Sequence, residues 1–218
     1  MNRLIAFDMD GVIFKHHNFW MELHKELGTL EDGIELTKKY VKDNYQKLVE
    51  EVIGRVWADK PAKPYFDLIA EHHYVMGARK TFEKIQREKD KSMLISSGPY
   101  DLALRAQREL SIDYIFANRL VIQNGRIVGT KDMSLWPIKN DSKVEPLEKT
   151  RKSLEIDGKR VIAVVHDKND ILLAKHVKNT LKGKVIGFMF EPHPEVEQEC
   201  SVIVRSNNLT DILEHIYQ

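Results

Sequence analysis

Two aspartates one residue apart, Asp8 and Asp10, are the residues of this chain best suited to chemistry. They follow the apolar run at residues 4–7 and precede Gly11. If that run is a buried parallel strand, both carboxylates lie at its carboxyl end, where open α/β sheets bind ligands. Neighbouring carboxylates repel each other, so one is readily protonated or a metal ion neutralises both. The pair is therefore a candidate nucleophile and acid–base group beside a cation, although a surface turn after a strand would use the same residues.

Two further sites carry groups that suit a phosphate. Ser97 and Gly98 are expected in a loop after the apolar run at 93–95, at the start of a helix. A small hydroxyl residue and free backbone N–H groups in this position can bind an anion, but an ordinary helix cap explains them as well. Lys143 stands near the start of another predicted helix, and taken alone it is only a surface lysine.

The fourth site is an acidic stretch after the β-branched run at 161–165. It contains His166, Asp167, Asn169 and Asp170. An acidic, asparagine-containing strand end suits a hydrated hard cation. A capped turn, with Asn169 or Asp170 opening the next helix, is the alternative.

Short apolar runs alternate with helical patterns along the chain. The runs are β-branched or aromatic and too short for core helices, so we predict strands at 4–7, 93–95, 114–116, 161–165, 185–190 and 202–204. Helices are predicted at 76–89, 100–110, 142–154, 171–181 and about 208–216. This alternation is typical of an α/β fold with a doubly wound, Rossmann-like parallel sheet and helices on both faces.

Two segments interrupt the alternation. Residues 14–76 contain no convincing strand and repeat apolar residues at helical spacing, so we interpret them as a helical cap inserted after the first strand. The chain then divides into a core of residues 1–13 and 77–218 and a cap of residues 14–76. Asn124-Gly125 between β-prone runs predicts a small β-hairpin.

The composition limits the partners. Among 218 residues, 34 Lys and Arg balance 33 Asp and Glu, so no strong field attracts nucleic acid or an anionic membrane. No apolar stretch approaches the roughly 20 residues that cross a bilayer. The single cysteine, Cys200, fits a reducing compartment. We expect a cytoplasmic protein; the sequence gives no indication of an oligomeric state.

In order and approximate spacing, the four sites resemble the motifs of the haloacid dehalogenase superfamily, and within it the phosphoserine phosphatase group. The segment 98–120 and the hairpin after it strengthen the likeness. The resemblance implies a metal-dependent phosphomonoester hydrolase that acts on a small phosphorylated metabolite through an aspartyl-phosphate. A catalytically weakened protein that binds a phosphorylated ligand and a phosphotransferase are the alternatives.

The resemblance also implies roles for the matched residues. Asp8 would be the nucleophile, and Asp10 would protonate the leaving alkoxide and then activate water. Ser97 and the Gly98 N–H would hold phosphoryl oxygens, and Lys143 would offset negative charge. Mg²⁺ would bind the Asp8 carboxylate, the Asp10 carbonyl and an acidic residue of the fourth site.

The fourth site departs from the family pattern Gly-Asp-x-x-Asn-Asp. Aligned without a gap on Asn169 and Asp170, His166 replaces the metal-binding aspartate. With a gap, Asp167 takes that place at a spacing one residue short. Histidine is a poor Mg²⁺ ligand and a better one for Mn²⁺ or Zn²⁺, so another divalent ion is an alternative. His166, Asp167 and Asp170 are all candidate metal ligands, and Asn169 is a candidate substrate-binding residue.

The predicted cap carries two looser matches. Arg55 matches the arginine that binds the substrate carboxylate in phosphoserine phosphatases. The position of the acidic residue that binds the serine amine falls near His17. We therefore expect a substrate other than phosphoserine.

Overall fold

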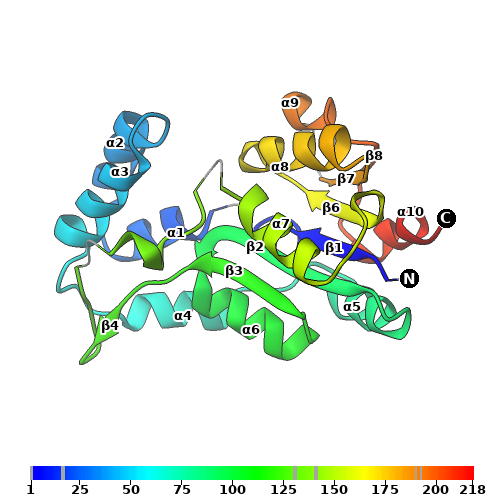
Figure 1. The fold of residues 1–218 in the computed structure, drawn as a ribbon. Helices are drawn as coiled ribbons and strands as arrows, with labels where there is room; N and C mark the ends of the chain where they lie inside the picture. The colour runs from blue at the N-terminus through cyan, green and yellow to red at the C-terminus, as the bar shows by residue number, and fades with distance from the viewer. Residues whose placement is uncertain (1, 16–17, 130–131, 140–141, 190, 192) are drawn as a thin grey trace.

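A six-stranded parallel sheet forms the centre of the computed structural model (Figure 1), which describes residues 2–15, 18–129, 132–139, 142–189, 191 and 193–218. Along the sheet the strands lie in the order β3-β2-β1-β6-β7-β8. Their bounds are β1 (Leu4–Phe7), β2 (Lys91–Pro99), β3 (Tyr114–Asn118), β6 (Val161–Val165), β7 (Lys184–Phe188) and β8 (Val202–Val204). The order reverses at β1, which pairs with β2 on one side and β6 on the other. This is the predicted Rossmann-like arrangement, and its ligand crevice lies at the carboxyl ends of β1 and β6.

Helices cover both faces of the sheet. Successive residues of each strand point to opposite sides, and because these residues are apolar, both faces are buried beneath helices. Ile5 and Phe7 pack with the first face, and Leu4 and Ala6 pack with the second. The first face is covered by α5 (Ala78–Arg87), α6 (Tyr100–Leu110), η6 (Leu209–Ile212) and α10 (Leu213–Tyr217). The second is covered by α7 (Val144–Ser153), α8 (Ile171–Lys175), η5 (His176–Thr180) and α9 (Pro194–Glu197). Burial on both faces explains why the strands read as continuous apolar runs rather than alternating ones.

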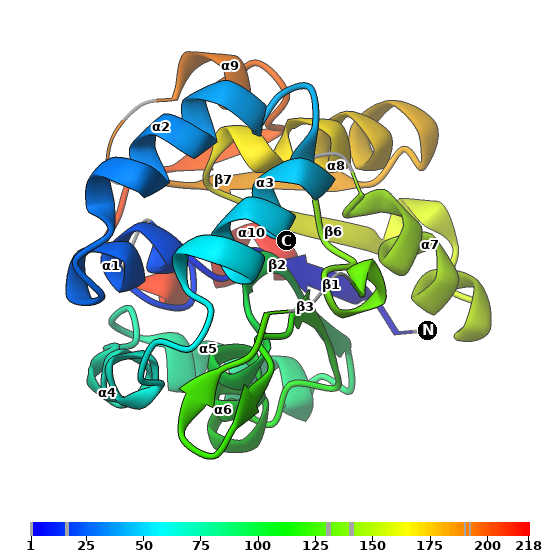
Figure 2. The same ribbon diagram turned by 90° about the vertical axis from the view of Figure 1, so that its left-hand side faces the viewer.

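In its described part, the insert between β1 and β2 is mainly helical, as the sequence predicts. It forms α1 (Phe19–Glu26), α2 (Leu30–Tyr40), α3 (Tyr45–Glu51), the π-helical turn η1 (Val52–Val56) and α4 (Lys63–Glu71). Figures 1 and 2 show α1, α2 and α3 on the side of the sheet to which the carboxyl ends of β1 and β6 point. The insert therefore stands over the crevice.

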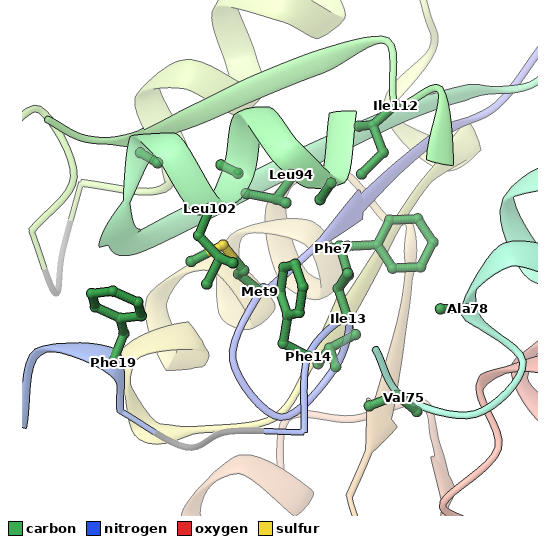
Figure 3. Close-up of a cluster of buried hydrophobic side chains, with 14 of the residues drawn as sticks. Phe7, Met9, Ile13, Phe14, Phe19, Val75, Ala78, Leu94, Leu102 and Ile112 are labelled. Carbon is green, nitrogen blue, oxygen red and sulfur yellow. The ribbon is translucent and has the colours of Figure 1, made fainter. Parts of the chain in front are cut away.

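The insert and the sheet share one hydrophobic core. Leu23, Val49 and Trp57 of the insert belong to the same buried cluster as Phe7 and Leu94 of the sheet. Figure 3 shows part of this cluster, in which Phe7, Leu94 and Leu102 lie around Met9 and Phe14 of the turn that follows β1. The division into a core of residues 1–13 and 77–218 and a cap of residues 14–76 stays a prediction.

The predicted hairpin is present and contacts the insert. Its strands are β4 (Ile122–Gln123) and β5 (Arg126–Ile127), and Asn124 and Gly125 between them both have positive φ, 51° and 72°. The Ile127 N–H donates to the Lys60 carbonyl, and the Asp59 N–H donates to the Ile127 carbonyl. Backbone hydrogen bonds thus join the hairpin to the part of the insert between η1 and α4.

One prediction about the loops was wrong. Ser96, Ser97 and Gly98 do not lie in a loop after residue 95, because β2 continues to Pro99. The pairing of β2 with β3 shifts register between Ile95 and Pro99, and it resumes in the shifted register at the pair Pro99–Asn118. An irregular strand end, rather than a free loop, therefore carries this site. The remaining short helices are η2 (Met133–Leu135), η3 (Gly158–Arg160) and η4 (Lys168–Asp170), and none of the described helices is long and apolar enough to cross a membrane.

Candidate active site

A cavity of about 360 Å³ lies at the carboxyl ends of β1, β2 and β6, beneath the helical insert. Its floor is lined by core residues from all four predicted sites: Asp8, Asp10, Ser96, Ser97, Gly98, Lys143, Asp167, Lys168 and Asn169. Its volume is in the range of small-molecule sites. The fold therefore gathers sites that are separated by more than a hundred residues in the sequence.

A tight turn presents the two aspartates. The Asp8 N–H still donates to the Val164 carbonyl of β6, at 3.1 Å, and the chain then leaves the sheet. The Met9 carbonyl accepts hydrogen bonds from the N–H groups of Ile13 (2.9 Å) and Phe14 (3.1 Å), which folds the chain back on itself. Asp10 consequently faces the insert, where its carboxylate accepts from the Phe19 N–H at the start of α1, at 3.5 Å.

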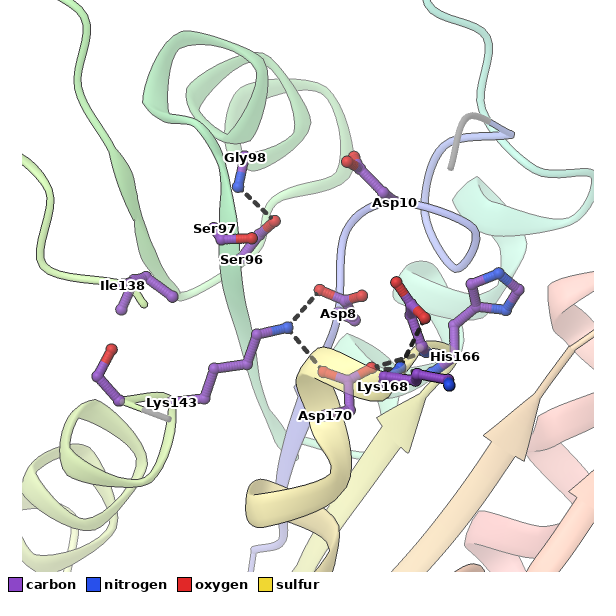
Figure 4. A network of polar contacts seen from close by, with 12 residues as sticks. Asp8, Asp10, Ser96, Ser97, Gly98, Ile138, Lys143, His166, Lys168 and Asp170 are labelled. Atoms are coloured by element: carbon purple, nitrogen blue, oxygen red, sulfur yellow. Dashed lines mark hydrogen bonds and ion pairs between the residues drawn. The ribbon is translucent and has the colours of Figure 1, made fainter. Parts of the chain in front are cut away.

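Lys143 links two buried carboxylates. Its Nζ lies 2.8 Å from Asp8 Oδ1 and 2.7 Å from Asp170 Oδ1 (Figure 4). Lys143 is 2% exposed and Asp170 is 0% exposed. The other oxygen of Asp170 accepts from the N–H groups of His166 (3.0 Å) and Asp167 (3.2 Å). Asp170 is thus held on both oxygens and positions Lys143 beside Asp8.

The electrostatics of this group follow from its burial. Burial raises the pKa of Asp8, the negative charge of Asp170 raises it further, and the Lys143 ammonium opposes both. For Lys143, burial lowers the pKa, but Asp170 and Asp8 outweigh burial and the net direction is upward. Lys143 therefore stays a cation and can offset negative charge at Asp8.

The end of β2 is fixed by hydrogen bonds on both sides. The Gly98 N–H donates to Ser96 Oγ at 3.0 Å, so this donor already has a partner within the protein. The Ser97 carbonyl accepts from Trp20 Nε1 at 2.8 Å and from Asn118 Nδ2 at 3.0 Å. A Cβ at Gly98 would lie 2.4 Å from the Met9 methyl group, so a larger residue there would displace the end of the Met9 side chain.

The fourth site separates its candidate ligands. Asp167 and Asn169 line the cavity with Asp8, and the Asp167 carboxylate also caps η4 by accepting from the Lys168 N–H at 2.6 Å. The His166 ring does not line the cavity. It packs against Gly11, and its Nδ1 lies 3.2 Å from the Phe188 carbonyl oxygen.

The structure does not bring Arg55 into the cavity either. Val52 and Ile53 of η1 line the cavity, and Arg55, further along this turn, faces outward with its side chain 62% exposed. Its Nε lies 2.8 Å from Glu51 Oε2, one helical turn earlier. His17, the other predicted cap position, lies outside the described residues.

Sequence reasoning missed several residues of the site. Asn118 is fully buried, and its Nδ2 donates hydrogen bonds to the carbonyls of Ser97 and Ile138. The only feature of the sequence that pointed to Asn118 was its position at the end of a predicted strand. Ser96, whose Oγ accepts a hydrogen bond from the Gly98 N–H, was given no role in the sequence analysis although it lies next to Ser97. The residues that the insert contributes to the cavity had no signal beyond the apolar spacing of amphipathic helices.

The donors at the cavity floor fit a hard divalent cation. Asp8, Asp10 and Asp167 all line it and offer oxygen, which Mg²⁺ prefers. Among the described residues, no three His, Cys, Asp or Glu side chains form a cluster that could hold an ion by themselves. Mg²⁺ usually takes one or two carboxylates and completes its shell with water and substrate phosphate, so this arrangement suits an ion held jointly with a phosphorylated substrate.

Comparison with known proteins finds relatives that carry the same name, phosphoserine phosphatase. No protein-family model matches the chain. The chain is 26% identical over 217 residues to the phosphoserine phosphatase of Methanocaldococcus jannaschii, covering 98% of this chain and 97% of that one. It is 30% identical over 156 residues to the phosphoserine phosphatase of Lactococcus lactis, covering 72% of this chain and 68% of that one.

Solved structures agree with this. A phospho-aspartyl intermediate analogue of phosphoserine phosphatase is 25% identical, with a TM-score of 0.81 and 99% of both chains covered. A substrate-bound phosphoserine phosphatase complex shares the fold, with 24% identity, the same TM-score of 0.81 and 99% of both chains covered. The chain belongs to the phosphoserine phosphatase-like group of the haloacid dehalogenase superfamily, whose named relatives are hydrolases of phosphoric monoesters.

Proposed function

We propose that this protein is a divalent-metal-dependent phosphomonoester hydrolase that acts on a small phosphorylated metabolite, with Asp8 as its nucleophile. The observation that carries the proposal is the position of Asp8, which lies at the floor of the cavity, bonded to Lys143 and close in sequence to Asp10. The relatives named phosphoserine phosphatase support the reaction class. The single cysteine, which fits a reducing compartment, supports a cytoplasmic location.

The reaction takes place in two steps on one phosphorus atom. A carboxylate oxygen of Asp8 attacks the phosphorus, the bond to the alcohol oxygen breaks, and Asp10 gives its proton to that oxygen. Asp10, now a carboxylate, then accepts a proton from a water molecule that attacks the same phosphorus. Asp8 is regenerated and inorganic phosphate leaves. Ser97 and Lys143 stabilise the negative charge of the phosphoryl group.

The cation would be held by the Asp8 carboxylate, the Asp10 carbonyl and the Asp167 carboxylate. Its positive charge lets a carboxylate approach a phosphate dianion that would otherwise repel it. Asp167 is preferred to His166 because it lines the cavity, and to Asp170 because both oxygens of Asp170 are engaged. With oxygen donors only, Mg²⁺ or Mn²⁺ is expected rather than Zn²⁺.

The test is phosphate release from 4-nitrophenyl phosphate with EDTA, Mg²⁺ or Mn²⁺. We expect metal-dependent release that Asp8→Asn abolishes and that Asp10→Asn reduces by roughly 10²- to 10⁴-fold. Asp167→Asn should raise the metal concentration needed for half-maximal rate, whereas His166→Gln should not. Full turnover by Asp8→Asn would show that another residue is the nucleophile.

One observation favours a second candidate, a phosphate-binding protein with weak turnover. The fourth site is one residue shorter than the family pattern, and its last carboxylate is fully used in bonds to Lys143 and two N–H groups. Such a protein would be stabilised against heat by phosphate esters without cleaving them. Rapid hydrolysis of the same esters would exclude this candidate.

A further inference from the structure

The roof of the cavity consists of Trp136 and the lining residues that the insert contributes between residues 18 and 57. Its side chains are mainly apolar and aromatic, unlike the polar and charged side chains of the floor. All three tryptophans of the chain, Trp20, Trp57 and Trp136, line this one cavity. Trp20 lies between the other two, with ring centroids 5.9 Å from Trp57 and 5.1 Å from Trp136. Val41 and Leu48 extend the apolar surface along the insert. A substrate whose phosphate reaches Asp8 therefore has its alcohol part against indole rings and aliphatic side chains.

The polar atoms of two of these indoles are already used within the protein. Trp20 Nε1 donates to the Ser97 carbonyl, and Trp57 Nε1 lies 3.2 Å from both His24 Nδ1 and Thr29 Oγ1. These bonds fix the rings in place and leave mainly their carbon surface to a ligand. A rigid aromatic surface of this kind binds flat apolar groups at little entropic cost.

Among the described residues, the roof supplies no Asp, Glu, Lys or Arg to the cavity lining. The one titratable imidazole there, His24, is buried, and burial lowers its pKa to about 4, so it is neutral near pH 7. Burial likewise raises the pKa of Tyr45 to about 12. An ammonium or carboxylate on the alcohol part would lose its water without gaining a charged partner from the roof, which is strongly unfavourable.

We propose that the preferred substrate is a phosphomonoester of an uncharged, apolar alcohol that carries a ring, rather than of an amino acid. The proposal concerns the leaving group only, and it rests on the proposed function for the phosphoryl group. Arg55, which would have to meet a substrate carboxylate, instead pairs with Glu51 outside the cavity.

Three primary alkyl esters test the proposal: 2-phenylethyl phosphate, ethyl phosphate and O-phosphoserine. Because all three leaving groups are primary alcohols, differences in kcat/KM report mainly how the alcohol part is bound. We expect 2-phenylethyl phosphate to exceed ethyl phosphate by roughly 10- to 100-fold, the effect of burying one phenyl group, and phosphoserine to fall below ethyl phosphate. A kcat/KM for phosphoserine equal to or above that for 2-phenylethyl phosphate would overturn the proposal.

A pair of variants at Leu48 tests the roof directly. Leu48 is a half-buried lining residue outside the catalytic groups. Leu48→Arg adds a cation for a substrate carboxylate, whereas Leu48→Gln shortens the apolar surface without adding charge. We expect the ratio of kcat/KM for phosphoserine to that for 2-phenylethyl phosphate to rise at least about tenfold more in Leu48→Arg than in Leu48→Gln. Equal ratios in the two variants would contradict the assignment of this surface to the leaving group.

Binding separates failure of this inference from failure of the proposed function. Tryptophan fluorescence reports ligands directly, since every tryptophan lines the cavity. The probes are 3-phenylpropylphosphonate and 2-amino-4-phosphonobutanoate, which replace the ester oxygens of 2-phenylethyl phosphate and phosphoserine by carbon. With the divalent ion present, we expect 3-phenylpropylphosphonate to bind more tightly than 2-amino-4-phosphonobutanoate. If no ester is cleaved, the proposed function fails while this titration still decides the ligand class; equal or tighter binding of the amino acid analogue overturns the inference.

Discussion

At the scale of single residues, Lys143 has a clear electrostatic role, because it is a buried cation bonded to both Asp8 and Asp170. Lys143→Met would leave two buried carboxylates facing each other. Removing one partner of a buried ion pair costs about 3–5 kcal/mol, so we expect a loss of about 3 kcal/mol in the free energy of unfolding, measured by urea denaturation, together with loss of turnover.

The double variant Lys143→Met, Asp170→Asn is the matched control for Lys143. It removes one of the two unpaired charges, so it should recover part of the lost stability while turnover stays absent. If Lys143→Met alone changed stability by less than about 1 kcal/mol, the ion pair would be unimportant for folding.

His24 gives the molecule an acid-sensitive position. It is 3% exposed, and its Nδ1 lies 3.2 Å from the Trp57 Nε1 donor and 2.9 Å from Thr29 Oγ1. Burial lowers its pKa from 6.5 to about 4. As pH falls, the unfolded chain takes up the proton first, so the contribution of neutral His24 is complete above pH 6.5 and is lost between pH 6.5 and 4. The loss has an upper limit of about 3 kcal/mol.

Urea denaturation at pH 7 and pH 4.5 measures this loss. His24→Gln removes the titration while keeping a polar side chain, so the wild type should lose more stability than the variant between these two pH values. Parallel losses in the two proteins would mean that other groups govern the acid sensitivity.

At the scale of elements, the turn after β1 depends on one glycine. Gly11 has φ +75°, and a Cβ there would lie 2.3 to 2.8 Å from three atoms of the His166 ring. Gly28, after α1, has φ +65° and open space around its Cβ position. Gly28→Ala should therefore lower the free energy of unfolding by only about 1–2 kcal/mol, the cost of placing a residue with a Cβ in the left-handed conformation. Gly11→Ala adds a clash of about 1–3 kcal/mol and should reduce kcat, because Asp10 is its neighbour.

Thermal unfolding and turnover of these two glycine variants provide the comparison. Equal destabilisation would mean that the His166 ring moves aside without cost. A Gly11→Ala protein with normal kcat would mean that the aspartate turn tolerates the displacement.

The comparison of sequence and structure also belongs to the element scale. The strands were predictable because they are short, continuous apolar runs such as Leu4–Phe7, too short for core helices, and the helices because apolar residues recur in them at helical spacing. The four sites were predictable because each follows a strand or opens a helix at one edge of the sheet. The extension of β2 to Pro99 was not, since it depends on pairing with Asn118 across an irregularity of register.

Side-chain directions were the least predictable feature. The choice between His166 and Asp167 depends on space beneath Gly11 and on the Phe188 carbonyl, which are far away in the sequence. Arg55 and Val52 occupy one π-helical turn, and only its packing decides which of them faces the cavity. Local patterns carry no information on such long-range contacts.

At the scale of the whole molecule, the insert is tied to the sheet in three ways. Its apolar side chains share the cluster that contains Phe7 and Leu94. Backbone hydrogen bonds join Lys60 to the hairpin at Ile127. In addition, the guanidinium group of Arg105 in α6 donates a hydrogen bond of 2.9 Å to the carbonyl of His72, the residue that follows α4. Contacts of this kind make separate unfolding of the insert unfavourable, because it would expose one face of the shared core.

We therefore expect the insert and the sheet to unfold in one cooperative transition. The three tryptophans lie around the cavity between the insert and the sheet, so their fluorescence follows the opening of this interface, whereas far-ultraviolet circular dichroism follows all helices and strands. Coincident urea midpoints for the two signals are the mark of a single transition. A fluorescence midpoint at clearly lower urea would show that the insert detaches first, in which case the shared cluster contributes less to its attachment than its burial indicates.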